Sequence, residues 1–240
     1  WKYVGLLGVV TGFLITGYYA VVSGWCLQYV YASLVGELKG NPQYVMDYFT
    51  TFSHNPVRPA IWTLVILFTA HFVIIHGVRG GIERASKLMM PTLFVLLLII
   101  VVASCLLPGA DKGVDFLLRP DFSKMTKSMF LGALGQSFYS LSLGVGTILV
   151  YSSYVSKKEN LLVSGLGTAA FDLMFALMAG FAVMTAVFSA GVTPGAGPGL
   201  IFESLPYVFA TMGESAPVLS GIIAIVFFVT ILISALTSAV

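Results

Sequence analysis

Long uncharged tracts dominate this 240-residue sequence and constrain its fold more than any motif does. The Lys, Arg, Asp and Glu residues fall mostly in short clusters, and the tracts between the clusters are long and apolar. A tract of about 20 residues, rising about 1.5 Å per residue as a helix, crosses a hydrocarbon core of about 30 Å. The sequence therefore predicts an all-α polytopic membrane protein, a single transmembrane domain with six spans at residues 3–36, 59–78, 88–109, 128–154, 161–190 and 216–240.

The composition excludes several classes of protein. Only 9% of the residues are charged, whereas soluble domains average about 25%. An ordinary soluble enzyme, a disordered tail and a nucleic-acid-binding protein are excluded on this ground. The expected surroundings are a lipid bilayer, with no nucleic acid as partner, and the oligomeric state does not follow from the sequence.

The loops predict an orientation. Lys and Arg are equally numerous on the two sides, but those within residues 79–87 and 157–159 stand in short loops, where the positive-inside rule has most force. We therefore place these loops in the cytoplasm, and loops 37–58, 110–127 and 191–215 outside a cell inner (plasma) membrane. The breaker-rich stretch 191–199, followed by apolar residues 200–210, suits either a re-entrant lid or a flexible connector. Because the chain begins at Trp1 and ends inside an apolar run, we expect an interior fragment of a longer protein.

The fourth tract contains a polar interruption near its middle. Residues 136–146 combine an amide, several hydroxyls and two glycines, Gly144 and Gly146. Each glycine weakens a helix by about 1 kcal/mol relative to alanine, and an unwound segment at mid-membrane exposes carbonyl oxygens to a ligand. Small residues also permit close helix packing, which is the alternative explanation. Packing does not account for Gln136 and the hydroxyls together, so we favour a binding site.

Two further features break the rules for a lipid environment. Asp172 is the charged residue that lies deepest inside a predicted span, where an unpaired carboxylate is costly and usually functional. A protonated or hydrogen-bonded structural Asp is the alternative. In the last tract, Ser234, Thr237 and Ser238 share one helix face and offer oxygen atoms suited to a hard cation, although such hydroxyls often bond to their own helix.

Three groups of residues, in order along the chain, match a known pattern. They are Tyr18-Tyr19 with Trp25, Gly81-Ile82-Glu83-Arg84 with Lys87 and Met90-Pro91, and the run GQSFYSLSLGVG at residues 135–146 followed by Tyr151-Ser152-Ser153-Tyr154. They resemble helices three, five and six of the neurotransmitter:sodium symporter family, in its bacterial branch. The resemblance implies helices three to eight of a twelve-helix transporter with the leucine-transporter fold, an inverted-repeat bundle with a broken helix.

The resemblance also implies a substrate site. The hydroxyl of Tyr19 would bind a substrate carboxylate, and the side-chain pocket would be lined by Ile15 and Val145. The substrate ammonium would meet the carbonyl groups of Tyr139, Ser140 and Ser142. The implied function is sodium-coupled symport of amino acids or related small zwitterions by alternating access, with no enzymatic activity and no organic cofactor.

Sodium sites and gates follow from the same resemblance. Ser140 and Asp172 match ligands of a first sodium ion, and the residues that match the second sodium site are Ser234, Thr237 and Ser238. Tyr139 matches an aromatic gate and Tyr154 an intracellular gate. The family's chloride-independent bacterial members carry an acidic residue where this chain has Ala176, so we hypothesise that Asp172 supplies the fixed negative charge. The alternatives are a proton-coupled transporter that uses Asp172, an intramembrane aspartyl protease and a non-transporting membrane scaffold. The protease would need a second carboxylate beside Asp172, and the spans of this chain offer no such partner.

Overall fold

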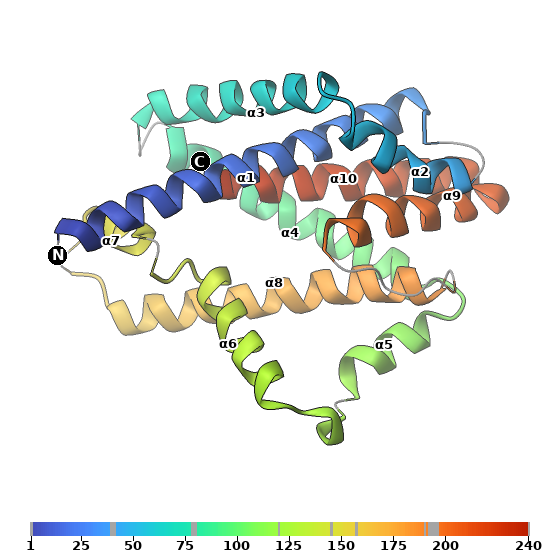
Figure 1. Cartoon of the computed structure of the whole chain (residues 1–240). Coiled ribbons are helices and arrows are strands. Elements are labelled where there is room, and N and C mark those ends of the chain that lie inside the picture. Colours follow the sequence, from blue (N-terminus) through green and yellow to red (C-terminus); the bar gives the residue numbers. More distant parts are fainter. Residues whose placement is uncertain are drawn as a thin grey trace. The chain divides into compact units, whose positions relative to one another are not determined.

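A computed structural model describes residues 2–38, 42–77, 81–119, 121–144, 146–156, 158–189, 191 and 197–239 of the chain. Within these ranges all regular secondary structure is helical (Figure 1). The chain forms two compact units. The first unit consists of Trp1–Gly17 and Arg119–Leu177, and the second unit of Tyr18–Leu118 and Met178–Val240.

Five helices are long and apolar enough to cross a membrane, and each covers most of one of the predicted spans. They are α1 (Lys2–Val35), α3 (Arg58–Ile75), α4 (Glu83–Cys105), α8 (Leu161–Ser189) and α10 (Pro217–Ala239). The tract at residues 128–154 holds two shorter helices, α6 (Lys127–Ser140) and α7 (Thr147–Ser152), with a break between them. The predicted all-α membrane fold with a broken helix is therefore confirmed.

The remaining helices are short and connect the long ones. They are α2 (Pro42–Ser53), α5 (Ala110–Leu118), the 3-10 turn η2 (Phe122–Lys124), the π-helical η3 (Leu200–Ser204) and α9 (Leu205–Ser215). Residues 191–210 were expected to form either a re-entrant lid or a flexible connector. Residues 198–215 form one continuous helical segment, in which η3 runs directly into α9. This segment packs on α2 and α10 within the second unit.

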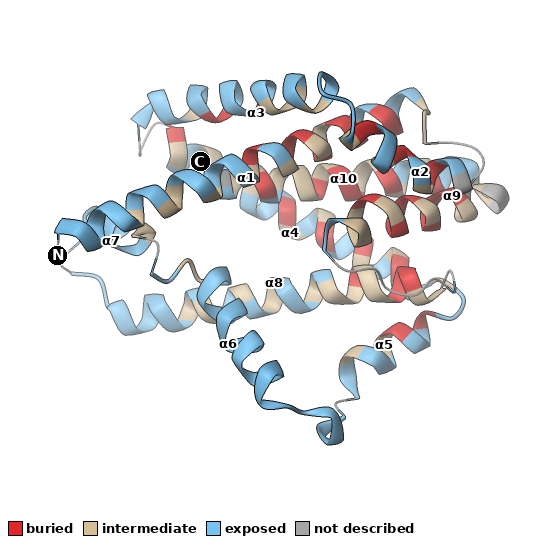
Figure 2. Cartoon of the chain, viewed as in Figure 1, coloured by how far each residue is buried: buried red, intermediate tan, exposed pale blue. Residues whose placement is uncertain are grey.

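The core of the second unit is a cluster of aromatic side chains. Buried residues gather on the second half of α1 and on α2, α9 and α10 (Figure 2). Tyr29 of α1 is fully buried, and its ring lies 5.2 Å from Phe202 and 4.8 Å from Phe228, measured between centroids. Its hydroxyl donates a 2.7 Å hydrogen bond to the carbonyl of Phe202. This bond satisfies the buried phenol and ties η3 to α1.

Two glycines allow helices of the second unit to cross at short distance. A Cβ atom at Gly24 of α1 would lie 2.9 Å from the backbone nitrogen of Thr63 in α3. A Cβ atom at Gly113 of α5 would lie 2.6 Å from the Cα of Thr185 in α8. Both contacts are with backbone, which cannot rotate away, so these crossings require glycine.

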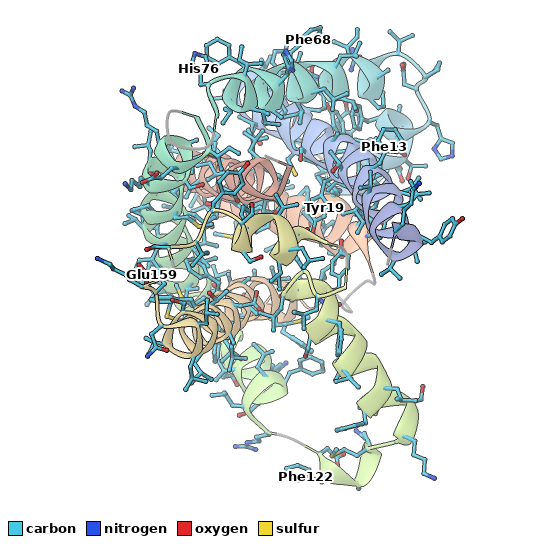
Figure 3. The ribbon with its side chains drawn as sticks, turned by 90° about the vertical axis from the view of Figure 1, so that its left-hand side faces the viewer. Phe13, Tyr19, Phe68, His76, Phe122 and Glu159 are labelled. Atoms are coloured by element: carbon cyan, nitrogen blue, oxygen red, sulfur yellow. The ribbon has the colours of Figure 1, made fainter. Side chains whose placement is uncertain are left out.

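Helices of both units expose apolar side chains. No residue of α6 is buried, and Phe130 and Leu131 are each 65% exposed (Figure 2). In the second unit, Phe68 lies on the outward side of α3 and is 71% exposed (Figure 3). Exposing such apolar surfaces to water would cost free energy, whereas contact with lipid or with further helices avoids that cost.

Candidate ion and substrate site

The break in the fourth tract is built by local backbone chemistry. Thr126 caps the start of α6, because its Oγ1 accepts a 3.2 Å hydrogen bond from the amide of Met129. The helix ends at Ser140, and α7 begins at Thr147. Gly144 and Gly146, which were expected to favour unwinding, have φ angles of 83° and 86°, a left-handed conformation that glycine adopts at no steric cost.

Ser142 is the residue that turns the chain at the end of α6. Its φ angle is +53°, the only positive value at a non-glycine residue in the described ranges. Its amide donates to the carbonyl of Tyr139 at 3.1 Å, and the amide of Leu143 donates to the carbonyl of Phe138 at 2.9 Å. This pair of bonds is a Schellman motif, which normally has glycine at the left-handed position. A side chain there costs about 1–2 kcal/mol, and such strain is concentrated at functional sites.

This motif separates the carbonyl groups at the break into two classes. The carbonyls of Phe138 and Tyr139 accept the bonds that close the helix end. Those of Ser140 and Ser142 lie beyond the closing bonds and were expected to receive a substrate ammonium. A second lone pair on the Tyr139 carbonyl keeps that group able to accept one more donor.

Ser140 and Asp172 come together within the first unit. The Ser140 hydroxyl, at the last residue of α6, donates to Asp172 Oδ1 at 2.7 Å and to Oδ2 at 2.8 Å. Both oxygens of the carboxylate thus face the C-terminal end of a helix, which carries about half a negative charge. A carboxylate, a hydroxyl oxygen and a negative helix end form a set that attracts a hard cation.

Ile15 and the two predicted gate residues also belong to the first unit. Ile15 is half-buried on α1, Tyr139 is 48% exposed on α6, and Tyr154 is 64% exposed in the turn after α7. The start of α1 passes close to the break, since a Cβ atom at Gly146 would lie 3.9 Å from the Cα of Gly8. Val145, predicted to line the pocket, lies outside the described residues.

The other predicted site residues belong to the second unit. Tyr19 is half-buried on α1 (Figure 3), and its ring meets that of Tyr18 edge-on at 6.0 Å. On α10, the hydroxyls of Thr237 and Ser238 both donate to the carbonyl of Ser234, at 2.7 and 3.1 Å. These bonds direct the two hydroxyl oxygens to one point on the helix, and each oxygen keeps lone pairs for a cation.

The residues predicted to bind sodium offer oxygen atoms as ligands to a cation. Among the residues that the structure describes, no three His, Cys, Asp or Glu side chains come together as a metal cluster. The predicted sodium ligands are one carboxylate with hydroxyl and carbonyl oxygens, a set that suits a hard, weakly charged cation. The left-handed backbone conformation of Ser142 was not predicted, because serine carries no sequence signal for it.

Comparison with known proteins decides the family. The family described as the sodium:neurotransmitter symporter family matches this chain over residues 50–240. The chain belongs to the sodium:neurotransmitter symporter family. Members of this family are transporters and not enzymes, and the apolar helices make the chain part of an integral membrane protein.

Relatives with high identity cover the whole chain. A sodium-dependent transporter of Haemophilus influenzae is 36% identical over 100% of this chain and 52% of its own length. The sodium-dependent transporter YhdH of Bacillus subtilis is 40% identical over 100% of this chain and 52% of its own length. The chain therefore spans about half the length of the curated relatives that it matches.

A solved structure has the same fold as this chain. The crystal structure of MhsT in complex with L-phenylalanine superposes with a TM-score of 0.87 at 38% sequence identity, over 100% of this chain and 54% of the MhsT chain. MhsT has the leucine-transporter fold that the sequence motifs implied. The family and the fold inferred from the broken helix are thus both confirmed.

Proposed function

We propose that the whole transporter couples the inward movement of sodium to the uptake of an amino acid or a related small zwitterion, by alternating access across a cell inner membrane. The observation that carries this proposal is the Ser140–Asp172 hydrogen-bonded pair at the broken end of α6. Membership of a sodium-dependent family supports the choice of ion, and the amino acid bound by MhsT supports the class of substrate.

The first sodium ion is held by the Ser140 hydroxyl and the Asp172 carboxylate. The substrate ammonium binds at the carbonyl groups of Tyr139, Ser140 and Ser142, and the substrate carboxylate binds the Tyr19 hydroxyl. Ile15 and Val145 border the substrate side chain. A second sodium ion uses the α10 hydroxyls of Ser234, Thr237 and Ser238. Tyr139 and Tyr154 close the pathway on its two sides.

Asp172 also makes chloride unnecessary in this proposal. A fixed carboxylate beside the sodium ion supplies the negative charge that would otherwise come from a bound anion. Uptake by the full-length transporter should be unchanged when gluconate replaces chloride. The Asp172→Asn variant should become dependent on chloride or lose uptake; chloride-stimulated uptake by the wild type that persists in this variant contradicts the role.

Reconstituted full-length transporter provides the test of the function. Uptake of radioactive amino acids, supplied singly from a panel that includes L-phenylalanine, is measured with sodium outside and then with potassium outside. We expect accumulation with sodium only and, in medium without chloride, its loss in Asp172→Asn. Uptake that instead follows an inward proton gradient in sodium-free medium supports proton coupling and refutes the sodium symport. Absence of uptake for every amino acid, together with no sodium-dependent stabilisation, refutes transport itself.

A further inference from the structure

A cavity of about 480 Å³ lies at the end of α1, within the second unit. Its lining comes from the turn after α1, from one face of α2 and from the start of α3, and consists of Glu37, Tyr44, Asp47, Tyr48, Thr51, Phe52, Asn55 and Arg58. Small-molecule sites in proteins occupy about 300–1,000 Å³, so the cavity has room for a metabolite. None of these residues belongs to the proposed transport site.

The floor of the cavity is rigid. Tyr48 and Phe52 are 7% and 4% exposed. A hydrogen-bond chain fixes the Tyr48 hydroxyl: Trp62 Nε1 donates to Gln28 Oε1, Gln28 Nε2 donates to the Tyr48 oxygen at 2.6 Å, and that hydroxyl donates to Glu37 Oε2 at 2.8 Å. Gln28 is 2% exposed, so the middle of the chain is shielded from water. The carboxylate of Glu37 is thereby oriented before any ligand arrives, which lowers the entropic cost of binding.

The charged groups of the cavity are not paired with one another. Among the described residues, Glu37, Asp47 and Arg58 form no ion pair within 4.0 Å. The start of α3 is nevertheless fixed, since Asn55 Oδ1 accepts bonds from the amides of Val57 and Arg58 at 2.9 and 3.0 Å. One cavity therefore presents two carboxylates and one guanidinium, all available to a ligand.

This set of charges complements a ligand with two cationic groups and one carboxylate. We propose that the cavity binds a dibasic amino acid such as lysine, with its carboxylate at Arg58 and its two cationic groups at Glu37 and Asp47. Arg is suited to bind a carboxylate in two parallel bonds. The rings of Tyr44 and Tyr48, 6.3 Å apart and nearly perpendicular, add aromatic faces that attract a cation.

Binding of radioactive L-lysine to the purified full-length transporter tests this site. The measurement is made in potassium buffer without sodium, so that binding does not depend on the proposed sodium-coupled site. L-norleucine, which lacks the second cationic group, and cadaverine, which lacks the carboxylate, serve as competitors. We expect saturable lysine binding and competition by each analogue at least tenfold weaker than by lysine, the loss that follows from removing one charged contact.

Single substitutions locate the site. Glu37→Gln keeps an acceptor for Tyr48 while removing the charge, Asp47→Asn removes a charge at constant size, and Arg58→Gln removes the guanidinium group but keeps a polar side chain. Each should weaken lysine binding about tenfold. Asp111→Asn, which removes an exposed carboxylate from α5 outside the cavity lining, should leave lysine binding unchanged.

Two results would overturn the proposal. The first is an equal lysine affinity in the wild type and in the variant that combines the substitutions at Glu37, Asp47 and Arg58. The second is L-norleucine that competes as well as lysine. Sodium-driven uptake by the same variants is expected to persist, so the failure of one proposal is distinguishable from the failure of the other.

Discussion

Ser140 shares its hydroxyl hydrogen between the two carboxylate oxygens of Asp172, with Oγ–Oδ distances of 2.7 and 2.8 Å. The bond joins the last residue of the broken helix α6 to the long helix α8 within the first unit. The carboxyl group of Asp172 is thereby held beside the carbonyl groups that the break sets free.

Removal of the Ser140 hydroxyl should weaken sodium binding. In Ser140→Ala, a potential sodium ligand and the bond that orients Asp172 are both lost, and we expect the half-saturating sodium concentration for amino-acid binding to rise about tenfold. Ser137→Ala is the matched control, since the Ser137 hydroxyl donates to the carbonyl of Ala133 in its own helix at 3.0 Å. An equal shift in both variants would show that the Asp172 contact has no special role.

The break is predictable from sequence only in part. The pair Gly144 and Gly146 marks its position, because glycine is the residue that adopts their left-handed angles. The closing motif at Ser142 is not predictable, since serine rarely takes this conformation and the bonds that stabilise it form only in the folded helix end. The partner of Ser140 lies 32 residues away on another helix. The family resemblance implied this pair, but helix packing decides its geometry.

The hydrogen-bond chain that runs from Trp62 through Gln28 and Tyr48 to Glu37 was also predictable only in part. Gln28 stands in an apolar tract, where an amide needs a partner, and this was a usable signal. Its partners, Tyr48 and Trp62, come from two other helices, 20 and 34 residues away. A periodic pattern assigns residues to a helix face, but it does not tell which faces meet.

Substitution of Ser142 should change stability in opposite directions for different side chains. Ser142→Gly removes the left-handed strain and should raise the free energy of unfolding by about 0.5–1 kcal/mol, after the larger chain entropy of glycine in the unfolded state is subtracted. Ser142→Val places a β-branched side chain in this conformation and should lower it by about 2 kcal/mol. Thermal unfolding in detergent measures both. If Ser142→Val is as stable as Ser137→Val, which lies in the last turn of α6, the left-handed turn carries no strain.

The crossing of α5 and α8 should not tolerate a methyl group. In Gly113→Ala the new Cβ would meet the Thr185 Cα at 2.6 Å and the Met184 carbonyl oxygen at 2.7 Å. The backbones must separate, and we expect a loss of about 1–3 kcal/mol in the free energy of unfolding. Gly132→Ala in α6, where no heavy atom lies within 4 Å of the added Cβ, should change stability by less than about 1 kcal/mol. A Gly113→Ala variant as stable as wild type would contradict the close crossing.

Tyr48 should make stability sensitive to high pH. Burial raises the pKa of its phenol most, the hydrogen bond to Glu37 and the charge of Glu37 raise it further, and Gln28 and Arg58 lower it. A pKa raised in the folded state gives stability that is fully present below the unfolded value of about 10 and is lost as the pH rises above it.

Tyr48→Phe isolates this contribution. The variant leaves Gln28 and Glu37 without their shared partner and should be destabilised by about 1–3 kcal/mol at neutral pH. Its stability should then fall less steeply than that of the wild type between about pH 9 and pH 11.5, as followed by chemical denaturation in detergent. If the free energy of unfolding falls equally with pH in Tyr48→Phe and in the wild type over this range, a raised pKa at Tyr48 is ruled out.

Coupling between sodium and the amino acid is the central claim, and the flux of radioactive sodium into reconstituted vesicles tests it most directly. The full-length transporter should admit sodium faster when an amino acid that it accumulates is added outside. In medium without chloride, the amino acid should no longer stimulate this flux in Asp172→Asn, whereas in Ser137→Ala the stimulation should remain. Sodium entry that is indifferent to the amino acid, in a preparation that accumulates the same amino acid, would contradict the account.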